Sequence, residues 1–212
     1  MVNIDGLLAL WVFILFMVGT PGPANLLIMS LGARVGFWPA MRFNLGLVTG
    51  KICLNVAMAF GLLLLLAEQP FIKEAFKYIS AGFMIWLALR GWQAQPSSAI
   101  SEKETAQHKD ANRPAEKQAG AGYLSGLIVH PLNPKAWVMS VLAWTDFGPA
   151  LGPEMVQLIL IPLSFAVAQL VLHSLWCFAG VIMARSLQNS LLLTRALIIL
   201  TVLVVIWAVV TG

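Results

Sequence analysis

The stretch VFILFMVGTPGPANLLIMSL, residues 12–31, is an apolar run broken near its middle by the triplet PGP. A second apolar run, residues 121–145, is broken by HPLNPK about 110 residues further along the chain. Proline inside a helix removes a backbone N–H donor and clashes with the preceding turn. In lipid such a defect is tolerated only where protein or a water-filled cavity shelters the backbone. Paired breaks in two halves of a chain predict the binding site of a membrane transporter.

The composition is that of a membrane protein. The hydrophobic fraction is 59%, the charged fraction is 10% and the mean hydropathy is +0.85, whereas a soluble domain is about half apolar and about one quarter charged. The 212 residues provide for about six spans of roughly 20 residues each. The net charge of +4 is modest, and no stripe of aromatic and basic residues indicates nucleic-acid binding. We therefore expect a chain embedded in the lipid bilayer, with no nucleic-acid partner.

Apolar runs predict six transmembrane helices, at 6–31, 42–67, 71–91, 121–145, 154–183 and 192–210. Residues 93–120 are polar and charged, which predicts a solvated linker between two three-helix halves, 1–92 and 121–212. Because three is an odd number, similar halves lie in opposite orientations across the membrane. The predicted fold is an all-α integral membrane protein of six transmembrane helices, built as two inverted three-helix repeats with proline-broken first helices.

Basic residues predict the orientation, because cytoplasmic loops are enriched in Lys and Arg. Two basic loop residues, Lys73 and Lys77, fall on one side. The other side carries nine, namely Arg34, Arg42, Arg90, Lys103, Lys109, Arg113, Lys117, Arg185 and Arg195. This distribution places the 93–120 linker in the cytoplasm and both termini outside.

The first break, at Pro21, Gly22 and Pro23, predicts a site for a negatively charged group. The half-helix that restarts there begins with N–H groups that lack helical partners and carry partial positive charge. A carboxylate is stabilised at such a terminus, and Asn25 offers an amide contact beside it. The alternative is a kink that only shapes helix packing.

The second break adds a permanent charge, because Lys135 follows Asn133 and Pro134 within an apolar run. A charged residue inside a span costs about 2.5–3.5 kcal/mol on insertion scales and is a functional candidate by default. We expect Lys135 to bind a carboxylate and Asn133 to satisfy backbone carbonyls that the break leaves free. The alternative for Lys135 is snorkelling of its ammonium group to the membrane interface.

Two further polar residues lie inside predicted spans. Lys51 follows Gly46-x-x-x-Gly50, a spacing that lets two helices approach closely, so it is a candidate substrate contact in the bundle interior. Snorkelling is its alternative. His173 is a candidate carrier of a coupled proton, because histidine titrates near neutral pH, and its alternative is a hydrogen-bonded packing role. No Asp or Glu falls deep in a predicted span, so a carboxylate proton relay is not expected.

The two cysteines, Cys53 and Cys177, lie in apolar runs without CxxC spacing, which gives no indication of a metal site or a disulfide framework. No cofactor is expected. No nucleophile, base and orienting residue are recognisably grouped in the sequence, so an enzyme is not expected either.

Several stretches resemble the LysE/RhtB amino acid exporter superfamily. Thr20–Leu27 (TPGPANLL) is similar to the signature at the end of that family's first apolar run, and Asn133–Lys135 is similar to its Asn-Pro-Lys signature. The glycine-spaced second span and the helix ending GFMIWLALRG at 82–91 also resemble the family. With the chain length and the polar middle loop, the resemblance covers nearly the whole sequence.

The resemblance implies a multi-pass exporter of the bacterial inner membrane that moves amino acids or their derivatives by antiport against protons. It implies pathway residues at both breaks, namely Pro21, Gly22, Pro23, Asn133, Pro134 and Lys135. This chain departs from the family at Ala24, where many members have asparagine, and at Lys51, where relatives are usually apolar. The oligomeric state stays open, with a homo-oligomer as one option.

Two other functions compete with amino acid export. An intramembrane thiol-disulfide electron carrier needs each cysteine beside a break, whereas Cys53 and Cys177 lie about 30 and 42 residues beyond the breaks. A passive solute channel is the other alternative, and interior lysines favour a specific anionic group over a wide pore.

Overall fold

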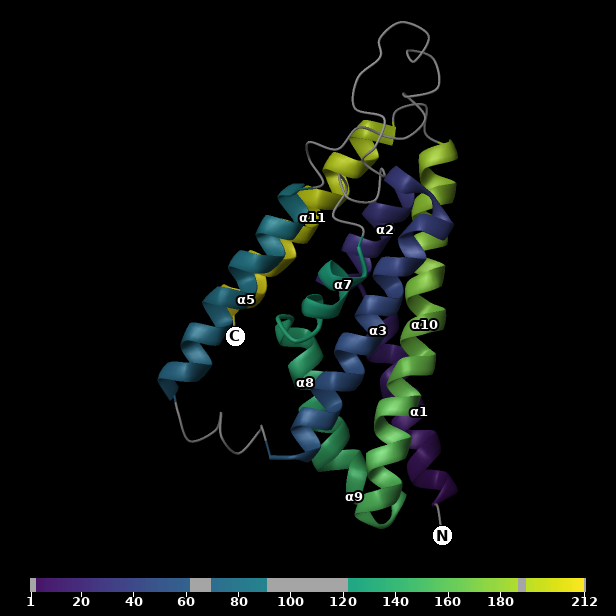
Figure 1. Cartoon of the computed structure of the whole chain (residues 1–212), viewed down its shortest axis with the longest axis vertical. Coiled ribbons are helices and arrows are strands. Elements are labelled where there is room, and N and C mark those ends of the chain that lie inside the picture. The colour runs from purple at the N-terminus through teal and green to yellow at the C-terminus, as the bar shows by residue number, and fades with distance from the viewer. Residues whose placement is uncertain (1–2, 62–69, 91–121, 187–189, 212) are drawn as a thin grey trace, which may run out of the picture.

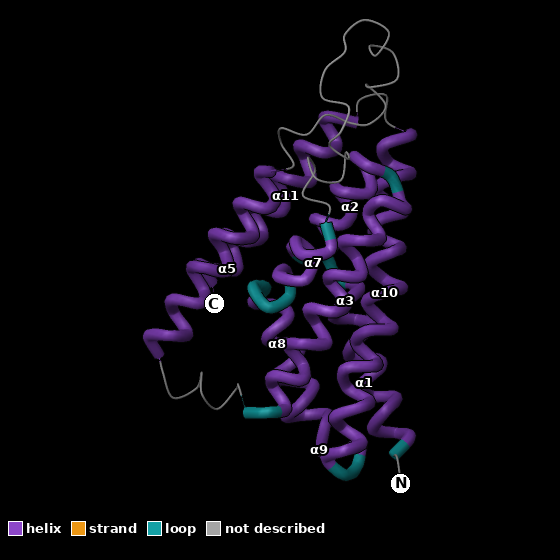
Figure 2. Tube along the Cα trace, in the orientation of Figure 1, coloured by secondary structure: helices purple, strands orange, loops and turns teal. Residues whose placement is uncertain are grey.

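The computed structural model describes residues 3–61, 70–90, 122–186 and 190–211, and the regular structure in these ranges is helical throughout (Figure 1, Figure 2). The predicted linker at 93–120 falls outside the described residues. For the described part of the chain, the predicted all-α class is confirmed.

The first predicted span is an apolar element broken into two helices. Asn3 caps α1 (Ile4–Gly19) through its Oδ1, which accepts two backbone N–H groups of the first turn. The backbone is then extended at Thr20 and Gly22, and α2 (Pro23–Val35) starts with a proline, whose missing N–H has no helical partner to lose. The axes of α1 and α2 differ by 55°.

A single residue, Gly36, connects α2 to α3 (Phe37–Ala59). Its φ of 84° is left-handed, a conformation that glycine adopts without steric cost. At the other end of α3 the chain turns at Gly61, which has φ 89°. The helix therefore starts before the predicted position 42 and ends before the predicted position 67, because glycine conformation and not hydropathy decides both ends.

The fourth predicted span is broken in the same way. α7 (Tyr123–Val129) ends before the turn at 130–133, and α8 (Pro134–Leu142) again starts with a proline. A π-helical turn (Ala143–Phe147) and the short helix α9 (Gly148–Leu151) complete this element. Both breaks predicted from the prolines are thus present.

Three longer helices complete the described structure. α10 (Glu154–Ser186) has 33 residues, about 50 Å at 1.5 Å per residue, which exceeds the roughly 30 Å of a bilayer's hydrocarbon core. Among the described residues, α10 is long and apolar enough to cross a membrane, and the bent pair α1–α2 passes the same test as one span. α5 (Pro70–Arg90) and α11 (Ser190–Thr211) pack on each other at one side of the bundle (Figure 1).

Helices in the two halves of the chain run in opposite directions (Figure 1). From the N-terminus, α1 and α2 ascend the bundle, whereas α7 and α8 descend it. In the same way α3 descends and α10 ascends, while α5 ascends and α11 descends. Among the described helices, the pair α1–α2, α3 and α5 thus run opposite to the pair α7–α8, α10 and α11, respectively.

Glycines let helices of the two halves touch backbone to backbone. A Cβ atom on Gly46 or Gly50 of α3 would collide with backbone atoms of α7, and one on Gly126 of α7 would collide with α3. A Cβ on Gly180 of α10 would collide with α2 in the same way. The close approach predicted from the Gly46-Gly50 spacing is confirmed.

The buried apolar side chains form two large clusters that are stacked along the bundle. One cluster gathers α2, the first half of α3 and the end of α7, with residues such as Ile28, Leu47 and Val129. The other gathers α1, the end of α3, α8 and the first half of α10, with residues such as Ile14 and Phe165. Along α3, α10 and the second break, buried polar residues lie between members of the two clusters: Lys51, Gln169, His173, His130 and Asn133.

Candidate functional site

A layer of buried polar side chains separates the two apolar clusters. All of its members expose 4% of their surface or less: Asn25, Lys51, Asn55, His130, Asn133, Ser140, Gln169 and His173. They come from both breaks, from the middle of α3 and from the middle of α10. Burying polar groups between apolar clusters is unfavourable unless they find partners, so the layer is a candidate for function.

At the first break, Asn25 satisfies the interrupted backbone. Its Nδ2 donates to the carbonyl oxygens of Val18 and Thr20, both at 2.8 Å. The N-terminus of α2 itself carries no side-chain cap, and its first helical bond runs from Leu26 N to Gly22 O at 3.0 Å. The N–H groups of Ala24 and Asn25 precede that bond and form the positive end of α2. This terminus is therefore suited to an anion.

At the second break, the backbone is satisfied by its own neighbours. Asn133 Oδ1 accepts the N–H of Lys135 at 3.1 Å, and the Asn133 carbonyl accepts the N–H of Ala136 at 2.9 Å. Trp137 Nε1 donates to the carbonyl of Pro131 at 2.7 Å. Asn133 therefore caps α8, whereas the sequence predicted that it would satisfy free backbone carbonyls. The N-terminus of α8 thus has a side-chain cap, and the N-terminus of α2 has none.

Lys135 joins the two breaks. Its Nζ donates to the carbonyl oxygen and to the Oγ1 of Thr20, both at 2.9 Å, and lies 3.5 Å from the carbonyl of Pro21. The side chain is half-buried and reaches across the bundle to the first break. A Cβ on Gly22 would lie 3.1 Å from Lys135 Cδ and 3.3 Å from its Nζ. Gly22 therefore leaves room for the lysine.

Lys51 is fully buried, with 0% of its surface exposed, midway along α3. Its Nζ donates to the carbonyl of Ala136 at 2.8 Å and to Ser140 Oγ at 2.7 Å, and it lies 4.1 Å from the ring centroid of Phe165. A cation over an aromatic face is stabilised electrostatically. Lys51 thus faces the interior and contacts α8 and α10, which disproves its snorkelling alternative.

Four polar side chains of the layer have ring or amide atoms without a hydrogen-bond partner in the part of the chain that the structure describes. Both imidazole nitrogens of His130, Nδ1 of His173 and both amide atoms of Gln169 and of Asn55 have no hydrogen-bond partner among the described residues. The rings of His130 and His173 stack with centroids 5.6 Å apart and planes inclined by 19°. Most buried polar atoms in proteins have a partner, so these atoms are available for a ligand.

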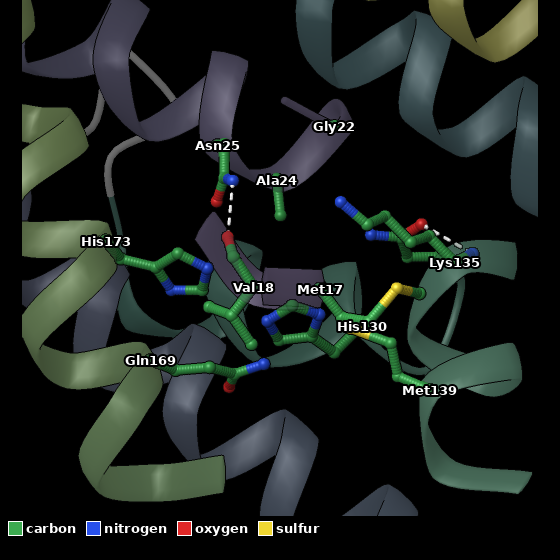
Figure 3. Close-up of a pocket in the computed structure, with 11 residues that line it drawn as sticks. Met17, Val18, Gly22, Ala24, Asn25, His130, Lys135, Met139, Gln169 and His173 are labelled. Carbon is green, nitrogen blue, oxygen red and sulfur yellow. Dashed lines mark hydrogen bonds between the residues drawn. The ribbon is translucent and has the colours of Figure 1, made fainter. Parts of the chain in front are cut away.

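A small cavity lies between the breaks and α10 (Figure 3). Its free space is about 10 Å³, about what one water molecule requires. The lining includes five predicted site residues, namely Gly22, Asn25, Asn133, Lys135 and His173. The other four, Pro21, Pro23, Pro134 and Lys51, do not line it. The remaining lining residues are Met17, Val18, Ala24, His130, Met139 and Gln169.

Of the residues that sequence reasoning did not assign to the site, His130 and Gln169 are the most informative. His130 was visible in the sequence because it opens the second break. Gln169 is an uncharged polar residue within the long apolar run 154–183, a signal that a search for charges alone passes over. Both are buried and both point to the cavity (Figure 3).

The chemistry of the described side chains offers no metal centre. No group of three or more His, Cys, Asp or Glu within the described residues is placed to hold an ion. Cys53 is exposed, Cys177 packs against Gly32, and neither lines the cavity. The cavity instead combines an ammonium group, a helix N-terminus, imidazoles and amides, a set that suits a small zwitterion.

The LysE type translocator family matches residues 15–211. The chain is 27% identical over 146 residues to an uncharacterized membrane protein, YrhP, of Bacillus subtilis, covering 68% of this chain and 69% of that protein. It is 26% identical over 148 residues to a membrane protein of Pseudomonas aeruginosa, covering 67% of this chain and 65% of that protein. No solved structure matches the chain.

The cysteine/O-acetylserine efflux protein of Salmonella typhi is 30% identical over 95 residues, which cover 45% of this chain and 47% of that protein. The match to that relative thus spans about half of its length. The family match, in contrast, extends over nearly the whole chain and includes both helix breaks. On this evidence the chain is a membrane protein and belongs to the LysE type translocator family.

Proposed function

We propose that this protein exports amino acids or close derivatives across the bacterial inner membrane in exchange for protons. The proposal rests on one observation: the ammonium group of Lys135 donates to Thr20, just before the uncapped N-terminus of α2, and both line or adjoin the same small cavity. An ammonium group and a helix N-terminus both stabilise a carboxylate. The efflux relatives from Salmonella, named for cysteine and O-acetylserine, support an amino acid substrate.

The proposed site holds the substrate carboxylate at the first break. Lys135 and the N–H groups of Ala24 and Asn25 are its binding groups, with Gly22 allowing the approach. Pro21, Pro23 and Pro134 act indirectly, because they open the helices and do not line the cavity. His173, which does line the cavity, is the proposed proton carrier. Lys51 does not line the cavity and acts on the site indirectly, because its ammonium group donates to Ala136 and Ser140 of α8.

Movement is required because the cavity of about 10 Å³ holds about one water and is too small for an amino acid. The described conformation therefore has no room for the substrate at this site. We propose that the halves 1–92 and 121–212 form inverted repeats and rock against each other to open the site on either side. The opposite course of their helices supports this arrangement (Figure 1).

The proposed topology follows from the basic loop residues. The linker 93–120 lies in the cytoplasm and both termini lie outside. The exposed acidic residues Asp5, Asp146 and Glu154 gather at the end of the bundle near the N-terminus and α9, which fits an outward face. A homo-oligomer is compatible with this topology.

The exchange of thiols for disulfides has less support than amino acid export. Cys53 is exposed on α3, whereas Cys177 is buried against α2. Electron transfer between two thiols requires that they approach each other or a shared partner. The positions of these cysteines outside the cavity favour amino acid transport.

The proposal is tested with the purified full chain in proteoliposomes. The vesicles are loaded with one unlabelled amino acid, and counterflow of the labelled form is measured for a panel that includes O-acetyl-L-serine, L-cysteine, L-threonine, L-lysine and L-glutamate. We expect saturable counterflow for at least one member and net export driven by an imposed proton gradient. Net transport of the amino acid that continues unchanged after the proton gradient is collapsed would favour the passive channel. Absence of counterflow for the whole panel would defeat the proposal.

A further inference from the structure

The stacked pair of His130 and His173 carries chemistry beyond holding a carboxylate. The two residues come from different elements, the second break and the middle of α10, and expose 1% and 2% of their surface. Their ring centroids lie 5.6 Å apart, and three of their four ring nitrogens have no hydrogen-bond partner among the described residues. Both rings line the cavity (Figure 3). The pair is therefore a buried site whose ring nitrogens can still form hydrogen bonds to a ligand.

The groups that face the pair are cationic or neutral. Lys135 of α8 and Lys51 of α3 bond to other groups, but both are close enough to act on His130 electrostatically. From α10 itself, Gln169 offers an amide one turn away, whose two polar atoms are also without partners among the described residues. α1 and α2 contribute Met17, Val18, Ala24 and Asn25 to the same cavity. The carboxylate side chains that the structure describes, those of Asp5, Asp146 and Glu154, are all exposed.

A zwitterionic substrate needs a place for its ammonium group as well as for its carboxylate. With no carboxylate in the described part of the polar layer, the acceptors that remain are neutral oxygen and nitrogen atoms. A neutral imidazole has one nitrogen lone pair that accepts a hydrogen bond, whereas a protonated imidazole has none. A protonated ring therefore offers the ammonium group no acceptor, and its charge repels the ammonium group from the neutral ring stacked on it.

We propose that the His130–His173 pair binds either the α-ammonium group of the substrate or a proton, and that this exclusion produces the exchange of substrate for protons. The inference rests on the proposed function and identifies how its two ligands compete. Two positive charges at this distance repel each other strongly where water is excluded. The stacked rings therefore accept at most one proton, and that proton repels the substrate.

The cycle balances one substrate against one proton. On the cytoplasmic side the pair releases its proton to water and accepts the substrate ammonium, while Lys135 and α2 hold the carboxylate. On the outer side the substrate leaves and a proton from water takes its place on one ring. No bond within the substrate is made or broken. This exchange mechanism also predicts poor transport of a basic amino acid, because its side chain brings a second cation near two lysines.

The test measures binding of O-acetyl-L-serine to the full chain in lipid nanodiscs by titration calorimetry between pH 5.5 and 7.5, where the ligand carboxylates stay ionised. The matched control ligand is 3-acetoxypropionate, which keeps the carboxylate and the ester and lacks the ammonium group. We expect the affinity for O-acetyl-L-serine to fall by about tenfold for each pH unit below the titration of the pair, since one proton competes with one ligand. Comparison of buffers with different ionisation enthalpies then shows close to one proton released for each ligand bound there, and none for 3-acetoxypropionate.

Variants assign the effect to the two rings. His130→Gln and His173→Gln keep a neutral polar side chain, and counterflow measures whether each variant is folded and able to bind. In both, we expect counterflow at neutral pH to be weaker than in the wild type but measurable, because a neutral amide still offers an acceptor. In the double variant, we expect the pH dependence of affinity and proton-driven export to be lost. A wild-type affinity that is constant over this pH range, or pH dependence that survives in the double variant, would overturn the inference while leaving amino acid export intact. Absence of counterflow for every amino acid would defeat the proposed function and this inference together.

Discussion

Replacement of Lys135 by Met is expected to reduce counterflow at low substrate concentration by about 10- to 150-fold. The substitution nearly preserves side-chain length and removes the charge. In the described state the ammonium donates to two oxygens of Thr20 at 2.9 Å each. A hydrogen bond between a charged group and its partner contributes about 1.5–3 kcal/mol, and about 1.4 kcal/mol corresponds to a factor of ten. Loss of one such bond to the substrate carboxylate gives the stated range.

The assay compares counterflow per molecule of protein in vesicles that contain equal amounts of each variant. Lys135→Arg keeps the charge in a larger, planar group and should retain part of the activity. Arg185→Met removes a charge from the exposed end of α10, away from the cavity, and should leave counterflow unchanged. Counterflow by Lys135→Met close to that of the wild type would remove Lys135 from the transport pathway.

Three further substitutions test the packing of the breaks and the roles of the cysteines. Gly50→Ala should lower the melting temperature in detergent, because the added Cβ collides with the backbone of α7. Gly82→Ala is the control and should not lower it, because no atom outside its own helix lies within 4 Å of the added Cβ. Equal melting temperatures of the two variants would contradict the close contact. Asn25→Asp should lower the yield of folded protein, because a carboxylate cannot donate to the two carbonyls that Asn25 now satisfies. Each buried carbonyl left unpaired costs about 1–3 kcal/mol of stability. An unchanged yield and melting temperature would argue against this role of Asn25. The double variant Cys53→Ser, Cys177→Ser should keep counterflow, and its loss in a folded variant would revive the thiol-disulfide alternative.

The sequence predicted the breaks because proline acts locally. Pro23 and Pro134 start α2 and α8 wherever the rest of the chain lies, since neither residue supplies an N–H donor to a preceding turn. It also predicted that Lys135 is a functional candidate, because a charge within an apolar run is unfavourable in lipid without a partner. The partner itself, Thr20, was not predicted, because it lies 115 positions away in the chain.

The roles of the two asparagines show the limit of such reasoning. Asn25 was expected to contact the substrate and Asn133 to satisfy carbonyls. In the structure Asn25 donates to two carbonyls of the first break, whereas Asn133 caps α8. An amide both donates and accepts, so its sequence neighbours do not decide which function it performs.

The amino-acid sequence by itself determined that the chain is helical, apolar enough for lipid and interrupted at two proline-marked positions, since these properties depend on composition and on neighbouring residues. Only the tertiary structure decided that Lys135 reaches Thr20, that Lys51 is buried against Ser140 and that His130 stacks on His173. These contacts join segments about 40 to 115 residues apart. They exist because glycine-lined backbones bring the helices of the two halves within reach, and no local pattern specifies which polar side chains then meet.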